Sequence, residues 1–138
     1  MKRIRVAAAV VWDGERLLMT QRAPGGALGL QWEFPGGKIE AEETPEQAIV
    51  REVREELGVG ATPHERLDSV THDYAHGTRV EIVFVRCTLD SHAFTLSHEV
   101  HAARWQAPAE IELGEVLEAD RDFLRSLGAG SAASRRES

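Results

Sequence analysis

The sequence predicts a mixed α/β fold, of the α+β kind, in a single domain. Its 138 residues are enough to bury one hydrophobic core and too few for two. Strand-like apolar runs come first, a well-marked helix follows, and further strands precede a terminal helix, with no repeat or linker between them. We expect a domain over residues 1–127. Residues 128–138 contain only Gly, Ala, Ser, Arg and Glu, which predicts a disordered tail.

The N-terminal third is predicted to form strands and a loop. The β-branched and Ala-rich run from Ile4 to Trp12 and the apolar run from Arg16 to Thr20 flank an Asp-Gly pair, which is typical of a hairpin. The glycine-rich segment 23–29 predicts a loop. Polar and aromatic residues alternate over 31–34, which predicts a short strand that a Pro-Gly-Gly sequence then breaks.

The central helix has clear start and stop signals. Thr44 is the expected N-cap, Pro45 suits the first helical position, and Gln47 completes a capping box with Thr44. Gly58 is expected to end the helix in the left-handed conformation. Residues spaced four apart form an apolar stripe that is expected to face the core, namely Ile49, Val53 and Leu57.

The C-terminal half is predicted to add three strands and a second helix. Strand-like runs cover 66–72 and 80–89, and a third lies at 103–106. Residues 108–113 predict a short helix or turn, and the apolar spacing over 117–127 predicts the last helix.

Composition excludes several classes of partner. The chain has 16 Lys plus Arg against 23 Asp plus Glu, a net charge of -7. An acidic chain without a basic cluster is poorly suited to nucleic-acid polymers or anionic membranes. The single cysteine, Cys87, permits no internal disulfide, and no apolar run is long enough to span a bilayer. We therefore expect a cytoplasmic protein.

Three carboxylates fall on one side of the central helix. Glu52, Glu55 and Glu56, here called the helix glutamates, occupy positions i, i+3 and i+4. One interpretation is a solvated helix face that Arg51 and Arg54 neutralise. The other is a site for a hard divalent cation such as Mg²⁺, which prefers carboxylate oxygens and bridges to phosphates.

The whole segment 36–59 decides between these interpretations. It reads GGKIEAEETPEQAIVREVREELGV and matches the pattern G-x5-E-x7-R-E-U-x-E-E-x-G-U, in which U is a bulky aliphatic residue. The chain therefore resembles the Nudix hydrolase family. The matching residues are Gly37, Glu43, Arg51, Glu52, Val53, Glu55, Glu56, Gly58 and Val59.

The resemblance implies a Nudix fold, in which a mixed sheet lies between helices and the matched segment forms a loop–helix–loop. It also implies that the helix glutamates bind Mg²⁺, or Mn²⁺ in its place, with help from the backbone carbonyl of Gly36. Glu43 would pair with Arg51 in a structural role. Glu52 also occupies the position where the family often has its catalytic base or water-orienting group. Both roles, metal ligand and base, are therefore kept as alternatives for Glu52.

Residues outside the motif resemble the MutT-like branch, which cleaves nucleoside triphosphates to the monophosphate and pyrophosphate. The match covers 31–40, including Phe34 and Lys38, both expected near the substrate. Arg22 would meet phosphate, although an ordinary surface arginine is an equal alternative. Glu99, six residues before Trp105, would be a further metal ligand or catalytic carboxylate, although it also fits a plain surface loop.

Asp120 is the candidate for contact with the base. Enzymes of the MutT type that act on 8-oxo-dGTP typically carry Asn here, and a carboxylate accepts hydrogen bonds only. Asp120 would therefore suit a base edge rich in donors, such as the cytosine amino group. The alternative is a helix-terminal acid favoured by the helix dipole. Phe34 and Tyr74 could stack on a base, but core packing or a plain surface position is favoured for each of them.

The expected reaction is Mg²⁺-dependent hydrolysis of an oxidised or pyrimidine nucleoside triphosphate, which clears the nucleotide pool. ADP-ribose or dinucleoside polyphosphates are the alternative substrates. A non-catalytic nucleotide sensor is the alternative of another class, although such domains usually lose these glutamates. We expect a monomer or a homodimer.

Overall fold

The computed structural model describes residues 2–130, which form two sheets and two α-helices. The strands and helices, in chain order, are β1 (Lys2–Val10), β2 (Trp12–Asp13), β3 (Arg16–Arg22), β4 (Trp32–Glu33), β5 (Gly36–Lys38), α1 (Pro45–Leu57), β6 (Ala61–Asp73), β7 (Thr78–Leu89), β8 (Val100–Gln106) and α2 (Glu118–Ser126). Two 3₁₀ turns, Pro108–Glu110 and Leu113–Glu115, precede α2.

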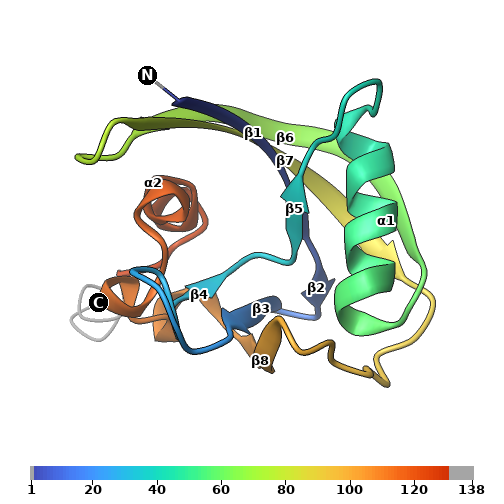
Figure 1. The fold of residues 1–138 in the computed structure, drawn as a ribbon. Coiled ribbons are helices and arrows are strands. Elements are labelled where there is room, and N and C mark those ends of the chain that lie inside the picture. The colour runs from blue at the N-terminus through green and yellow to red at the C-terminus, as the bar shows by residue number, and fades with distance from the viewer. Residues whose placement is uncertain (1, 131–138) are drawn as a thin grey trace.

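The first sheet is mixed and lies between the two helices. Its strand order is β5-β1-β7-β6, in which β1 and β7 are parallel and the other pairs are antiparallel. Figure 1 shows α1 on one face of this sheet and α2 on the other. The predicted mixed sheet between helices is therefore confirmed. A second sheet, in which β3 pairs with β2, β4 and β8, was not predicted.

Alternation along β1 and the residue after it, Val11, gives the protein two apolar cores. Ala7, Ala9 and Val11 pack with the buried face of α1, whereas Ala8 and Val10 pack with α2. Successive side chains of a strand point to opposite faces, and small alanines let both helices approach the sheet closely. A strand buried on both faces reads as a continuous apolar run, which is the pattern that this segment carries.

Helix α1 begins and ends as predicted. The Thr44 hydroxyl accepts a hydrogen bond from the Gln47 amide at 3.1 Å, and the Gln47 side chain accepts one from the Thr44 amide at 2.9 Å. Gly58 has φ 70° and donates its amide to the Arg54 carbonyl. The predicted stripe of Ile49, Val53 and Leu57 is fully buried.

Several boundaries differ from the predicted ones. The first strand ends at Val10, and the Asp-Gly hairpin joins β2 to β3. The predicted break after the short strand at 31–34 is confirmed, because β4 ends at Glu33, but residues 36–38 then form a separate strand, β5, that pairs with β1. Strand β6 begins before Pro63, which a strand at the edge of a sheet tolerates because one side needs no ladder hydrogen bond.

The core extends slightly beyond the predicted end of the domain. Ala129 is buried with the residues that pack around α2, although it falls within the segment predicted as a tail. Residues 131–138 lie outside the described part of the chain. Between residues 2 and 130, no helix combines the length and the apolar character needed to cross a membrane.

The burial of α1 predicts a contrast between two neighbouring substitutions. Ile49→Ala should lower the free energy of unfolding by about 2–5 kcal/mol, because it leaves a cavity under the helix. Val50→Ala, next in sequence but 41% exposed, should change it by less than about 1 kcal/mol. Urea denaturation of both variants checks this, and equal losses would show that α1 packs through a different face.

Candidate functional site

A cavity of about 540 Å³ gathers the residues that the sequence singled out. Its polar lining comes from α1, β4, β5 and the segment before β8, and its apolar lining comes from β1, β7 and the start of α2. The predicted site residues among its lining are Arg22, Phe34, Gly36, Lys38, Glu52, Glu56, Glu99 and Asp120.

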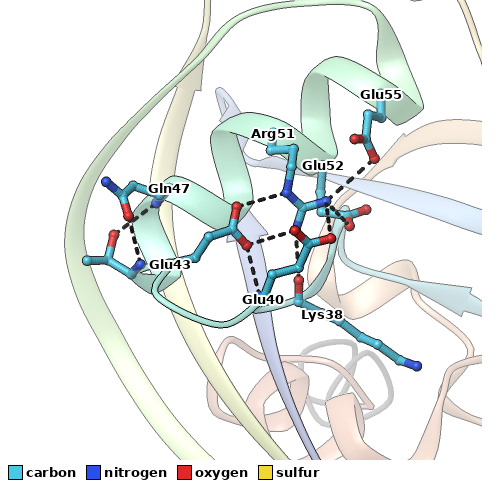
Figure 2. A network of polar contacts seen from close by, with 8 residues as sticks. Lys38, Glu40, Glu43, Gln47, Arg51, Glu52 and Glu55 are labelled. Carbon is cyan, nitrogen blue, oxygen red and sulfur yellow. Dashed lines mark hydrogen bonds and ion pairs between the residues drawn. The ribbon is translucent and has the colours of Figure 1, made fainter.

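Arg51 links α1 to the loop before it. Its guanidinium donates two hydrogen bonds to Glu43, at 2.8 and 2.9 Å, and one to the Lys38 carbonyl at 2.9 Å. It also donates to Glu52 at 2.7 Å and lies 3.6 Å from Glu55 (Figure 2). The pair of Glu43 and Arg51 that the resemblance implies is thus present, and it fixes the loop to the helix.

Glu43 and Glu52 both contact Arg51, but their pKa values are shifted in opposite directions. Hydrogen bonds from Arg51, with a further one from the Glu40 amide, lower the pKa of Glu43 to about 2. The same contacts raise the pKa of the Arg51 guanidinium. Burial raises the pKa of Glu52, and its contact with Arg51 only partly opposes that effect. Glu43 is therefore an anchored anion, whereas Glu52 is a carboxylate held at the cavity wall.

Glu56 is the most strongly perturbed of the helix glutamates. Its carboxylate accepts a hydrogen bond from the Gly36 amide at 3.1 Å. Burial nevertheless raises its pKa to about 8, and the charges of Glu33, Glu52 and Glu99 contribute in the same direction. Four carboxylates thus share one wall and repel one another.

The two glycines of β5 allow the backbone of this strand to lie close to the carboxylates of α1. Gly36 has φ 139°, and a side chain there would collide with the Ala7 carbonyl of the paired strand. At Gly37 a Cβ atom would lie 2.5 Å from the Glu52 carboxyl carbon. The strand can therefore pass directly beneath Glu52 only because both positions lack side chains.

Glu33 is a site residue that the sequence analysis missed. It lies on β4, lines the cavity, and forms an ion pair with Arg22 at 3.3 Å. Burial raises its pKa to about 7, although Arg22 opposes the shift. One signal was present in the sequence, because Glu33 stands between two aromatic residues in the predicted short strand.

Asp120 is buried in the first turn of α2, with 4% of its surface exposed. Its carboxyl group accepts a hydrogen bond from the Phe34 amide at 3.4 Å. Burial raises its pKa to about 8, and the nearby Glu33 adds to the shift. At neutral pH the group is therefore mostly protonated, so that it donates as well as accepts. The expectation of an acceptor-only carboxylate did not include this burial, which favours the protonated form.

The aromatic candidates differ in their surroundings. Phe34 is 3% exposed and makes edge contacts with Phe84 and Phe123, so its ring belongs mainly to the core. Tyr74 is half-buried, lines the cavity, and accepts a hydrogen bond from the Ala119 amide at 3.4 Å. Tyr74 therefore offers a ring at the apolar side of the cavity, beside Asp120.

The carboxylates that line the cavity are oxygen ligands of the kind that a divalent cation binds. Their side chains do not converge on one point in the cavity. Glu52, Glu56 and Glu99 line it, whereas the Glu55 side chain is 59% exposed and lies outside its lining. Over residues 2–130, no three acidic, histidine or cysteine side chains form a ready-made metal-binding group. An all-oxygen donor set with raised pKa values matches a hard cation, which would relieve the repulsion among these groups.

Comparisons with known proteins identify similar chains. A family model described as the NUDIX domain matches residues 1–127. The chain is 37% identical to the CTP pyrophosphohydrolase of Escherichia coli over 134 residues, which are 96% of this chain and 97% of that protein. It is 45% identical to the 8-oxo-dGTP diphosphatase of Proteus vulgaris over 74 residues, which are 53% of this chain and only 66% of that protein.

A solved structure agrees with these matches. The solution structure of the E. coli ORF135 protein superposes with a TM-score of 0.75 at 30% identity, covering 100% of this chain and 96% of the other. The similarity therefore extends over the sheets and both helices.

The Arg51 network predicts a local loss of stability. Arg51→Gln should lower the free energy of unfolding by about 1–3 kcal/mol, because Glu43 and the Lys38 carbonyl lose their charged donor. Arg54→Gln, on the exposed side of the same helix, should cost less than about 0.5 kcal/mol. Thermal and urea denaturation measure both. Equal effects would show that the network does not hold the loop.

The buried carboxyl groups predict that stability falls as pH rises. Glu33, Glu56 and Asp120 have folded pKa values of about 7, 8 and 8, against 4.5, 4.5 and 3.8 when unfolded. The folded state binds more protons between about pH 4 and 8, so the free energy of unfolding should fall across that window and then level off.

Melting temperatures measured from pH 5 to 9 in buffer containing a chelator test this dependence. Asp120→Asn and Glu56→Gln should each flatten the decline, because the amide carries no charge at any pH in the window. A wild-type melting temperature that rises steadily from pH 5 to 8 would contradict the burial of these groups.

Proposed function

The chain belongs to the NUDIX domain family, and from this premise we propose that it hydrolyses a nucleoside triphosphate to the monophosphate and pyrophosphate with the help of Mg²⁺. The observation that carries the proposal is the cavity itself. Glu52, which Arg51 holds, forms one part of its wall with the other lining glutamates, and apolar side chains with Tyr74 form another. Such a cavity suits a ligand with a highly charged end and a planar apolar end.

The residues proposed to hold the cation are Glu52, Glu56 and Glu99, together with the Gly36 carbonyl and Glu55 at the rim. A bound Mg²⁺ would neutralise phosphate charge and lower the pKa of a water molecule. Mn²⁺ has the same preference for oxygen ligands and is expected to substitute. The net charge of -7 then agrees with a phosphate-rich substrate, since the acidic wall acts through the cation.

The chain's own side chains would orient the substrate. Arg22 lies 3.3 Å from Glu33, at the edge of the carboxylate wall, where its guanidinium can pair with phosphate oxygens. Lys38 is exposed, and its side chain extends away from the Arg51 network in Figure 2, which leaves its ammonium group free for phosphate. Glu52 or Glu56 would accept the proton of the attacking water, because both stand at the wall with raised pKa values.

The favoured substrate is a nucleoside triphosphate with a pyrimidine base. Tyr74 and Asp120 line the same cavity as the carboxylates. A protonated Asp120 presents one donor and one acceptor, which matches a base edge where an amino group adjoins a ring nitrogen, as in cytosine. The relative that matches over nearly its whole length is named a CTP pyrophosphohydrolase, which supports CTP or dCTP, with 8-oxo-dGTP as the next candidate.

Two rival functions make different predictions. An enzyme acting on ADP-ribose or dinucleoside polyphosphates would release a nucleoside monophosphate without pyrophosphate. A nucleotide sensor would bind without turnover, but this chain retains every glutamate of the motif. Sanitation of the nucleotide pool, which is the proposed role, implies a cytoplasmic location.

Substrate class is tested by a panel of nucleotides with Mg²⁺. We expect pyrophosphate and a monophosphate from CTP, dCTP or oxidised nucleotides, resolved by ion-exchange chromatography. Release of AMP from ADP-ribose with no turnover of any triphosphate would favour the first rival. Absence of all hydrolysis with Mg²⁺ and Mn²⁺ would favour the sensor.

Glu56→Gln tests the proposed role of the carboxylate wall. The kcat should fall by about 10²-fold or more, since the amide neither ligates the cation strongly nor accepts a proton. The matched control is Glu46→Gln on the same helix, whose carboxylate pairs with Arg66 away from the cavity. That variant should keep wild-type kcat. Similar kcat values for both variants would remove Glu56 from the mechanism.

A further inference from the structure

A second cavity, of about 450 Å³, adjoins the first. The loop between β3 and β4 lines one side of it, from Ala23 to Gly29. The residues that line both cavities mark where the two meet, namely Arg22, Leu28, Glu33, Glu56 and Glu99. The second cavity therefore opens onto the same carboxylate wall, on the side of the glycine-rich loop.

The loop has a defined conformation. The Ala23 amide bonds to the Glu99 carbonyl at 3.0 Å, and the Leu30 amide bonds to the Arg22 carbonyl at 3.1 Å. Gly25 and Gly26 have φ values of 111° and 71°. A Cβ atom at Gly29 would lie 2.6 Å from the Gly25 carbonyl oxygen, so the loop is tightly folded on itself.

Within the described chain, the backbone amides of residues 25–28 donate no hydrogen bond to protein. Successive free amides in a loop with left-handed residues form a concave group of donors that suits an anion. The loop 23–29 carries no charged side chain, and the Arg22 guanidinium stands at its base. Residues 25–28 line the second cavity, which Glu33, Glu56 and Glu99 also line.

The acidic wall limits which anion can enter. Glu33, Glu56 and Glu99 would repel a bare phosphate, whereas the cation of a diphosphate–Mg²⁺ complex can lie between the phosphate oxygens and these carboxylates. The first cavity already offers an apolar wall and Asp120 for a nucleoside. A nucleoside triphosphate that spans both cavities would place its phosphate chain across the shared carboxylates.

We propose that the glycine-rich loop 23–29 and Arg22 form a subsite for the terminal diphosphate of the substrate, which becomes the pyrophosphate product. This proposal rests on the proposed function and adds a preference to it. Triphosphates should be bound more tightly than diphosphates or monophosphates of the same nucleoside, because only they reach the loop amides.

Nuclear magnetic resonance of the full-length, ¹⁵N-labelled protein tests the subsite without turnover. Inorganic pyrophosphate with Mg²⁺ should shift the amide resonances of 25–28 and leave those of Tyr74 and Ala119 in place. CMP should do the reverse. Shifts of the Tyr74 region by pyrophosphate, or no shift in 25–28 at saturation, would overturn the proposal.

A matched pair of variants adds an affinity measurement. Gly25→Ala and Gly14→Ala both replace a glycine of positive φ whose Cβ would meet open space, but Gly14 lies in the β2–β3 turn. Gly25→Ala should weaken Mg²⁺-pyrophosphate binding about tenfold in calorimetry, equivalent to losing one or two hydrogen bonds. CMP affinity should not change, and Gly14→Ala should match wild type for both ligands.

Equal pyrophosphate affinities for the two variants and wild type would overturn the subsite. This outcome is distinct from failure of the proposed function, which is decided by whether wild type releases pyrophosphate from any nucleoside triphosphate. Turnover with an unperturbed loop would reject the subsite alone. Absence of turnover with pyrophosphate bound at 25–28 would reject the activity and leave the subsite standing.

Discussion

The Arg51 guanidinium joins three parts of the chain that carry the site. It binds Glu43 in the preceding loop, the Lys38 carbonyl at the end of β5, and Glu52 on its own helix. Without the Arg51 guanidinium, the carboxylates of α1 would face Gly36 and Gly37 of β5, which have no side chains to pair with them. The contact fixes β5 against α1 and so determines where the Gly36 amide reaches Glu56. Among the carboxyl groups with raised pKa values, Glu52 is the one that Arg51 contacts directly.

Burial of like charges is the second constraint. Glu33, Glu52 and Glu56 have raised pKa values although Arg22 and Arg51 lie close by, because the desolvation of each group exceeds what its partner restores. An arrangement of this kind reduces stability in the absence of a counter-charge, and such costs are typical of functional sites. We therefore interpret the acidic wall as adapted to bind a cation and not as a structural network.

Much of the fold could be predicted because local signals and tertiary packing agree. The capping box at Thr44, the stripe through Val53, and the Asp-Gly hairpin each specify one structure, and the structure has all three. The second sheet and strand β5 depend on pairing between distant residues, which periodicity cannot reveal. The same limit applies to the site. The spacing of the helix glutamates was visible, whereas the burial of Glu33 and Asp120 appears only when β4 and α2 come together.

Carboxyl groups with raised pKa values are proposed to form the divalent-cation site. Calorimetric titration of the metal-free protein with Mg²⁺ at pH 7, repeated in buffers of different ionisation enthalpy, counts the protons released on binding. Since the pKa of the proposed ligand Glu56 is about 8, we expect saturable binding with release of about one proton per cation. Binding without proton release, or no saturable binding, would contradict a cation site formed by these carboxyl groups.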